Sequence, residues 1–138
     1  KRAYAYSKFL ESDVVICYKQ RTKANVVSKM ELIGNVEDKN VVLIDDMMDT
    51  AGTLTHAANL MMERGAKSVR AFCTHALLSG DALKKIETSN LKELIITDSI
   101  ALKRKNSKIK ILSCAELFAS TMYNVHHNES ISSKFIDY

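Results

Sequence analysis

The hydrophobic positions form short apolar runs that alternate with segments of helical periodicity. Residues 41–44 are four consecutive apolar residues, the pattern of a strand buried on both faces of a parallel sheet. Residues 54–63 follow with apolar residues at helical spacing, and Arg64 and Gly65 supply the cationic last turn and glycine typical of a helix end. The same criteria predict a core strand over 13–18, strands over 68–76, 94–97 and 109–112, a strand or ribbon within 26–36, and helices over 1–10, 81–88 (with Asp81 as N-cap) and 115–126.

Strands that alternate with helices over short connections indicate an α/β fold, in which a mostly parallel central sheet is flanked by helices. The length of 138 residues predicts a single domain over 1–138. The N-terminal residues have the pattern of a helix interior without a cap, so we expect the chain to start within a longer protein. Ligands of such sheets bind at the carboxyl ends of the strands, which directs attention to residues 45–53.

Composition and charge indicate which kinds of ligand or partner the chain could bind. The chain is 46% hydrophobic and 26% charged, and it has no apolar run near the roughly 18 residues of a membrane-spanning helix, so neither disorder nor a membrane is expected. The formal charge is +5 over residues 1–29, −5 over 30–66 and +4 over the remainder. This distribution fits a site for hydroxyls, metal and phosphate better than the basic stripe of a nucleic-acid-binding protein. Cys17, Cys73 and Cys114 lack a CxxC spacing, which argues against disulfides and zinc and favours a cytoplasmic location.

Residues 45–53 (Asp-Asp-Met-Met-Asp-Thr-Ala-Gly-Thr) combine an acidic pair with a helix start. The unpaired N–H groups and positive dipole end of a helix start bind anions, and Gly52 lets a ligand approach the backbone. Asp45 and Asp46 would repel a bare phosphate, but they can accept hydrogen bonds from sugar hydroxyls. Ribose 5-phosphate meets both conditions, with Mg²⁺ bridging its diol and the carboxylates. The candidate binding residues are Asp45, Asp46, Asp49, Thr50, Ala51, Gly52 and Thr53, of which Asp45 and Asp46 are also the candidate metal ligands.

A purely structural interpretation stays open, in which the acidic pair is ordinary strand-end polarity and Asp49 or Thr53 caps the helix. The GxxxxGK[ST] and GxGxxG patterns are absent, which excludes a Walker loop and a dinucleotide fingerprint. His56 and the adjacent His126 and His127 are interpreted as exposed helix residues. His75, at the end of a strand, is a weaker candidate for lining the site.

The 45–53 segment resembles the phosphoribosyl-binding loop of type I phosphoribosyltransferase-fold proteins, specifically the ribose-phosphate pyrophosphokinases (PRPP synthetases). Residues 19–26 (Lys-Gln-Arg-Thr-Lys-Ala-Asn-Val) are similar to the catalytic flexible loop of that family. The resemblance is collinear over essentially the whole chain. The departures are Ala76, Asp81 and Ala101, which stand where the family commonly has glycine, proline and proline.

The resemblance implies transfer of a pyrophosphoryl group from Mg-ATP to the 1-hydroxyl of ribose 5-phosphate, giving PRPP and AMP. It implies that Lys19 and Arg21 stabilise the charge on the transferred group, that Asp45 and Asp46 face the ribose hydroxyls and Mg²⁺, and that residues 49–53 hold the 5-phosphate. It also implies that this chain is the C-terminal half of a two-domain, homo-oligomeric enzyme. The ATP-adenine contacts would then lie in the other half, and the 138 residues alone would be inactive.

Three alternatives remain at this point. Without the resemblance, the segment around Lys19 and Arg21 is a solvated basic loop. A phosphoribosyltransferase would use the same binding loop for PRPP but would not require that basic segment. A non-catalytic regulatory subunit related to the synthetases would be expected to lose the basic segment or the acidic pair, and both are intact here.

Overall fold

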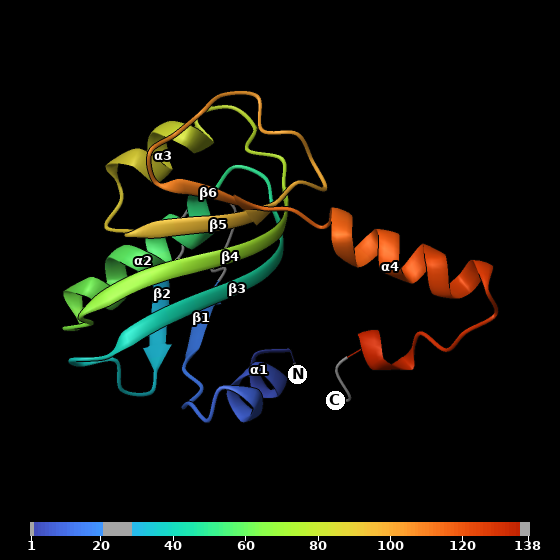
Figure 1. Cartoon of the computed structure of the whole chain (residues 1–138). Coiled ribbons are helices and arrows are strands. Elements are labelled where there is room, and N and C mark those ends of the chain that lie inside the picture. Colours follow the sequence, from blue (N-terminus) through green and yellow to red (C-terminus); the bar gives the residue numbers. More distant parts are fainter. Residues whose placement is uncertain (1, 21–28, 136–138) are drawn as a thin grey trace.

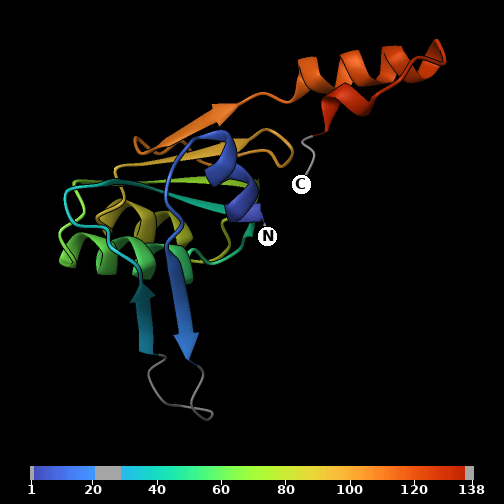
Figure 2. The ribbon, with the colours of Figure 1, turned by 90° about the horizontal axis from the view of Figure 1, so that it is seen from below.

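The computed structural model describes residues 2–20 and 29–135, and its centre is a four-stranded parallel sheet (Figure 1). The strand order is β3-β4-β5-β6. Helices α2 and α3 pack against the same face of this sheet (Figure 2). The α/β class with a parallel central sheet flanked by helices is therefore confirmed. The elements are α1 (Arg2–Phe9), β1 (Ile16–Gln20), β2 (Lys29–Ile33), β3 (Asn40–Met48), α2 (Gly52–Glu63), β4 (Ser68–Ala76), α3 (Ala82–Thr88), β5 (Glu93–Thr97), β6 (Ile109–Leu112), α4 (Ala115–His126) and a 3-10 turn (Ser132–Lys134).

The core lies between α2, α3 and the inner face of the sheet. Ala58 and Met61 of α2 are at most 2% exposed, as are Val69 on β4 and Leu94 on β5. Burial of a large apolar side chain stabilises a fold by about 1.5–3 kcal/mol. This packing fixes the position at which the chain leaves β3 and enters α2, and hence the geometry of residues 45–53.

The first predicted strand lies at the border of the core and outside the central sheet. Over the described ranges β1 pairs only with β2, in an antiparallel ribbon that is separate from the central sheet, and Ile16 and Tyr18 are 56% and 55% exposed. The prediction of a core strand over 13–18 is therefore right only in part, because Val15 and Cys17 pack against the core whereas the alternate side chains are exposed. The ribbon expected within 26–36 is confirmed, and its second strand ends before Gly34.

β3 differs from the prediction in burial and in length. Within the described residues only β4 pairs with it, so β3 is an edge strand, and Val42 and Ile44 are 45% and 38% exposed. Burial on both faces is therefore wrong for residues 41–44, because no element in the described part of the chain packs closely over the second face there. The strand also continues to Met48, so Asp45 and Asp46 lie within its last part instead of after it.

α3 is held at its two ends by lysine side chains. Asp81 occupies the N-cap position, but its carboxylate makes no capping hydrogen bond and pairs with the Lys85 ammonium at 2.7 Å. The prediction that Asp81 is the N-cap residue is therefore confirmed by its position, but the side-chain hydrogen bond of such a cap is absent. At the other end, the Lys108 Nζ donates to the carbonyls of Ile86 (3.3 Å) and Ser89 (2.7 Å). Lys108 thus supplies the positive charge that the C-terminal end of a helix favours.

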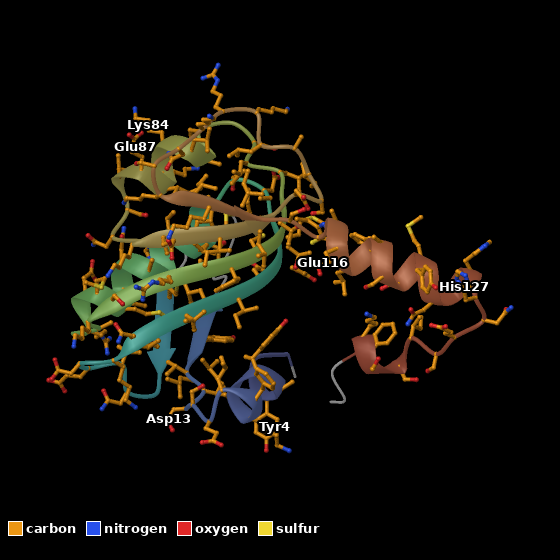
Figure 3. All side chains as sticks on the ribbon, in the orientation of Figure 1. Tyr4, Asp13, Lys84, Glu87, Glu116 and His127 are labelled. Carbon is orange, nitrogen blue, oxygen red and sulfur yellow. The ribbon has the colours of Figure 1, made fainter. Side chains whose placement is uncertain are left out.

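α4 extends away from the sheet, with Glu116 near its start and His127 just after its end (Figure 3). None of its residues is buried. His127 and His126 are exposed, as predicted, and the His127 ring stacks on Tyr123 with 4.0 Å between ring centroids. In the described part of the chain, no helix has both the length and the apolar character needed to cross a membrane.

Candidate functional site

Residues 45–53 connect the carboxyl end of β3 to the N-terminal end of α2, as the sequence predicts. The acidic pair lies on β3 opposite β4, where Asp45 pairs in register with Cys73. Asp49 and Thr50 form the exposed turn, and α2 begins at Gly52. The structure therefore brings the acidic pair and the helix start together at the carboxyl ends of the parallel strands.

The two carboxylates of the acidic pair are electrostatically coupled. The backbone N–H of Asp46 donates to Asp45 Oδ1 at 2.9 Å. Burial raises the pKa of Asp45; the N–H of Asp46 opposes this rise, and the negative charge of the Asp46 carboxylate adds to it. Hydroxyl donors or a cation between the two side chains would relieve this repulsion.

Cys73 lies next to the acidic pair on β4 and is 2% exposed. Burial raises the pKa of its thiol to about 11, and the charge of Asp45 adds to this rise. The thiol therefore stays neutral and places no third negative charge beside the carboxylates. The sequence offered no signal for this role, because it depends on the register between β3 and β4.

The start of α2 leaves its backbone donors available to a ligand. The N-cap residue is Ala51, and no described side chain makes a capping hydrogen bond at this end, so the interpretation in which Asp49 or Thr53 caps the helix is wrong. Ala51 has a left-handed conformation (φ 58°) and is buried, and Thr55 bonds back to its carbonyl through both N–H (3.0 Å) and Oγ1 (2.9 Å). Ala51 thus forms the tight turn that presents the first-turn N–H groups.

Gly52 leaves open space at the start of α2. A Cβ built on this residue would meet only Thr50 Oγ1, at 3.9 Å. An anion can therefore approach the N–H groups of the first turn without displacing a side chain. This agrees with the sequence prediction that Gly52 admits a ligand to the backbone.

A second loop, residues 77–80, holds the candidate site from the side of β4. The N–H of Leu77 donates to the Met48 carbonyl at 2.9 Å, and the N–H of Ser79 donates to the Asp49 carbonyl at 3.0 Å. Leu78 and Gly80 have left-handed conformations, with φ of 51° and 60°. The sequence does not indicate these contacts, because hydrogen bonds between backbone groups have no side-chain signature.

His75 also lies near the carboxyl end of its strand, β4, and is exposed. Its Nδ1 is 3.0 Å from Ser99 Oγ, and the Ser99 and Thr97 hydroxyls both donate to the Thr74 carbonyl, at 2.9 and 2.6 Å. The bond to Ser99 orients the imidazole at the end of β4. His75 therefore remains a residue at the border of the site.

Asp98 binds the residues just before α4, a structural role that the sequence did not indicate. Its carboxylate accepts hydrogen bonds from the Cys114 N–H (2.8 Å) and the Ser113 hydroxyl, and these two donors, in that order, hold its pKa below the usual range. The negative charge thus lies at the N-terminal end of α4, where the helix dipole favours it.

The basic segment is only partly described. Lys19 lies on β1, where it pairs in register with Met30, and Arg21 lies outside the described residues. The β1–β2 ribbon projects away from the four-stranded sheet (Figure 2). A contact between Lys19 or Arg21 and the candidate site therefore remains a prediction.

The acidic pair fits Mg²⁺ as part of a shared coordination shell. Among the described residues, no group of three or more His, Cys, Asp or Glu side chains could enclose a metal ion. Mg²⁺ is commonly held by one or two carboxylates together with water and substrate phosphates. Asp45 and Asp46 supply hard oxygen ligands whose mutual repulsion a cation would reduce, so the donor set is suitable only when substrate oxygens complete it.

Comparisons with known proteins cover nearly the whole chain. The model of the phosphoribosyl synthetase-associated domain matches residues 10–136. A Porphyromonas gingivalis protein named ribose-phosphate pyrophosphokinase is 50% identical over 135 residues, which are 98% of this chain and 43% of that protein. A Campylobacter jejuni protein of the same name is also 50% identical, over 98% of this chain and 44% of its own length. The chain thus spans less than half the length of these relatives.

A solved structure is similar to this chain in fold. The crystal structure of phosphoribosylpyrophosphate synthetase from Mycobacterium smegmatis matches with a TM-score of 0.80 and 29% sequence identity. The match covers 92% of this chain and 42% of the other. The fold expected from the sequence is therefore confirmed over nearly the whole chain.

Proposed function

The chain belongs to the phosphoribosyl synthetase-associated domain family and has a type I phosphoribosyltransferase-like fold, and from this premise we propose that it carries the ribose 5-phosphate site of a ribose-phosphate pyrophosphokinase. The observation that supports the proposal most is the uncapped start of α2 beside a coupled carboxylate pair. The first binds a phosphate and the second binds a diol. Ribose 5-phosphate has both groups on one small molecule.

In the proposed reaction, the 1-hydroxyl oxygen of ribose 5-phosphate forms a bond to the β-phosphorus of ATP. The bond from that phosphorus to the oxygen bridging it to the α-phosphorus breaks, AMP leaves with this oxygen, and the hydroxyl proton passes to solvent. Residues 49–53 hold the 5-phosphate and the acidic pair orients the ribose. Asp45 and Asp46, together with substrate oxygens, would hold Mg²⁺, and this ion would neutralise the phosphate charges.

The other parts of the proposal follow from the relatives, which are more than twice as long as this chain. We propose that the adenine contacts lie outside residues 1–138, so that this chain alone binds the sugar phosphate without turnover. We further propose that the working enzyme is a cytoplasmic homo-oligomer. A phosphoribosyltransferase that consumes PRPP would use the same loop and is the second candidate function.

The activity is tested with the longer polypeptide that contains this chain. We expect phosphorus NMR to show AMP and PRPP formed in equal amounts from ATP, ribose 5-phosphate and Mg²⁺, because β-phosphoryl attack releases AMP. Formation of ADP would contradict the proposed transfer. Consumption of PRPP only in the presence of a nucleobase would identify the second candidate function.

The proposed phosphate-binding loop, residues 49–53 (the anion loop), is tested separately with Gly52→Val. The added side chain meets no protein atom closely at its Cβ but occupies the space in front of the first-turn N–H groups. We expect the Kd for ribose 5-phosphate to rise about tenfold, the effect of losing roughly one charge-assisted hydrogen bond of about 1.5 kcal/mol. Calorimetric titration measures this change. Glu63→Val, at the other end of α2, is the control, and equal affinity losses in both variants would contradict the placement of the phosphate.

A further inference from the structure

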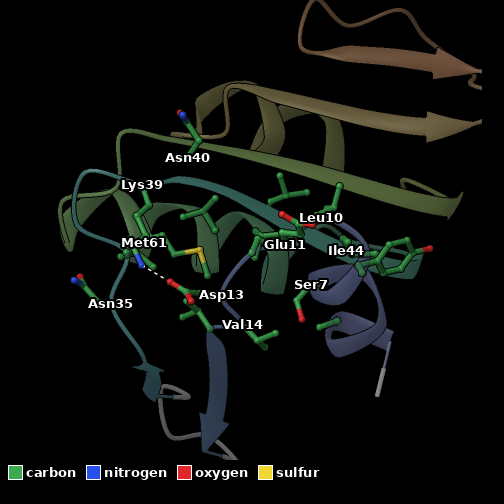
Figure 4. Close-up of a pocket in the computed structure, with 18 residues that line it drawn as sticks. Ser7, Leu10, Glu11, Asp13, Val14, Asn35, Lys39, Asn40, Ile44 and Met61 are labelled. Atoms are coloured by element: carbon green, nitrogen blue, oxygen red, sulfur yellow. Dashed lines mark hydrogen bonds and ion pairs between the residues drawn. The ribbon is translucent and has the colours of Figure 1, made fainter. Parts of the chain in front are cut away.

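In the described chain, the two sides of β3 differ in the groups that lie near the acidic pair. On one side, a cavity of about 590 Å³ lies between β3 and α1 (Figure 4). Its lining includes Ile44 but neither residue of the acidic pair. The ion pair in this lining, between Lys39 and Asp13 at 2.7 Å, is at the start of β3 and therefore at the other end of the strand. The strand in register with the acidic pair is β4, on the opposite side.

His75 lies on β4 within reach of a ligand bound by the acidic pair. It pairs in register with Met47, the residue after Asp46. At the usual spacing between strands and rise per residue, the Cα atoms of His75 and Asp46 are about 6 Å apart, and those of His75 and Asp45 are about 8 Å apart. The side chain of His75 is exposed, so a ligand at the acidic pair can contact it without a rearrangement of the core.

The hydrogen bonds around Ser99 determine which nitrogen of the His75 ring carries the proton. Four contacts share these groups: Thr97 Oγ1 to the Thr74 carbonyl (2.6 Å), Ser99 Oγ to the same carbonyl (2.9 Å), Thr97 Oγ1 to Ser99 Oγ (2.8 Å) and His75 Nδ1 to Ser99 Oγ (3.0 Å). The two hydroxyls supply only two protons, and the carbonyl supplies none. A third proton, on Nδ1, satisfies the contact with Ser99 while both hydroxyls donate to the carbonyl. The neutral imidazole therefore carries its hydrogen on Nδ1.

This tautomer leaves the Nε2 lone pair of His75 as an acceptor. In the described part of the chain, the ring makes its one side-chain hydrogen bond through Nδ1, to Ser99. Nε2 lies on the edge of the ring away from Ser99, which follows β5. Because β4 lies between β5 and β3, the strand on that side is β3, which carries the acidic pair. His75 thus offers an open, neutral acceptor beside the two carboxylates.

The 1-hydroxyl of ribose 5-phosphate is the group that this acceptor fits. In the proposed site, the acidic pair accepts hydrogen bonds from the 2- and 3-hydroxyls, and residues 49–53 bind the 5-phosphate. The 1-hydroxyl is then the donor of the sugar that still needs an acceptor, and it is next to the 2-hydroxyl on the ring. A neutral acceptor suits this position, because a third carboxylate would repel the phosphates of ATP.

We propose that His75 is a further substrate-binding residue, whose Nε2 accepts a hydrogen bond from the 1-hydroxyl of ribose 5-phosphate. This inference rests on the proposed ribose 5-phosphate site and adds to it a residue of a second strand, β4. The 1-hydroxyl oxygen attacks the β-phosphorus in the proposed reaction, so the bond fixes the position of the attacking atom. Phosphoryl transfer depends mainly on such positioning and on charge stabilisation.

Binding of two ligands to the longer polypeptide, without ATP, tests the inference. The first is ribose 5-phosphate, and the second is 1,4-anhydroribitol 5-phosphate, which has the same ring and phosphate but no 1-hydroxyl. We expect His75→Asn to raise the Kd for ribose 5-phosphate about three- to tenfold, the effect of losing one neutral hydrogen bond, and to leave the Kd for the anhydro compound unchanged. Asparagine keeps an N–H near the position of Nδ1, for Ser99, and has no counterpart of Nε2.

His75→Gln and His127→Asn are the matched controls. Glutamine places a carbonyl oxygen near the position of Nε2, so its Kd for ribose 5-phosphate should stay within about twofold of the value for the unmodified protein. His127 is exposed just after α4 (Figure 3), so the same exchange there should change neither Kd.

Two results for His75→Asn would overturn the inference and leave the ribose 5-phosphate site standing. One is an equal change of Kd for both ligands, which would mean that His75 supports the site only structurally. The other is no change for either ligand. If the unmodified polypeptide binds neither ligand, the proposed function fails, and this inference fails with it.

Discussion

Replacing Lys19 or Arg21 by alanine in the longer polypeptide is expected to lower kcat by about 10²-fold or more, with the KM for ribose 5-phosphate changed only a few-fold. The negative charge on the transferred phosphoryl and on its leaving group changes as the reaction proceeds, so a cation placed there acts mainly on the transition state. Loss of such an interaction lowers kcat, whereas loss of a ground-state contact raises KM. Steady-state rates of AMP formation, measured against ribose 5-phosphate concentration, separate the two effects.

The matched control for these variants is Lys84→Ala. Lys84 is exposed on α3 (Figure 3), so this substitution removes the same charge at a remote position. Its kcat should equal that of the unmodified protein. If Lys19→Ala and Arg21→Ala also keep a near-normal kcat, the segment is the solvated basic loop of the alternative interpretation.

The location of the candidate site could be predicted because it depends on local patterns. An apolar run, an acidic pair and a helix start occur in immediate succession, and parallel sheets bind ligands at the carboxyl ends of their strands. The edge position of β3 could not be predicted in this way. The run at residues 41–44 has the composition of an internal strand, yet among the described residues β3 pairs with β4 alone and the side chains of Val42 and Ile44 are exposed on one face.

The sequence did not show which partners the carboxylates of Asp81 and Asp98 take. Asp81 has the spacing of an N-cap residue but forms an ion pair with Lys85. Asp98 has no such spacing, and its carboxylate nevertheless bonds to the N–H of Cys114, 16 residues later. A cap selected by sequence spacing requires only local geometry, whereas the Asp98 contact exists because β5 and β6 lie side by side.

The acidic pair should affect the affinity for ribose 5-phosphate but not the affinity for inorganic phosphate, which the anion loop binds in our proposal. Replacing both Asp45 and Asp46 by asparagine removes two charged acceptors for the ribose hydroxyls, and a hydrogen bond to a charged group contributes about 1.5–3 kcal/mol. We expect the Kd of the chain for ribose 5-phosphate to rise about 10²-fold or more. Inorganic phosphate is expected to contact only residues 49–53, so its Kd should stay the same or fall slightly, because two nearby negative charges are gone.

Calorimetric titration of the double variant with each ligand measures this difference. Glu87→Gln on α3 is the control, since it removes a carboxylate charge at an exposed and distant position. Asparagine retains a carbonyl oxygen that can accept the Asp46 N–H bond seen at Asp45 Oδ1, so the local backbone should keep its conformation. An equal loss of affinity for ribose 5-phosphate and for phosphate would mean that the pair supports the loop structurally and does not bind the sugar.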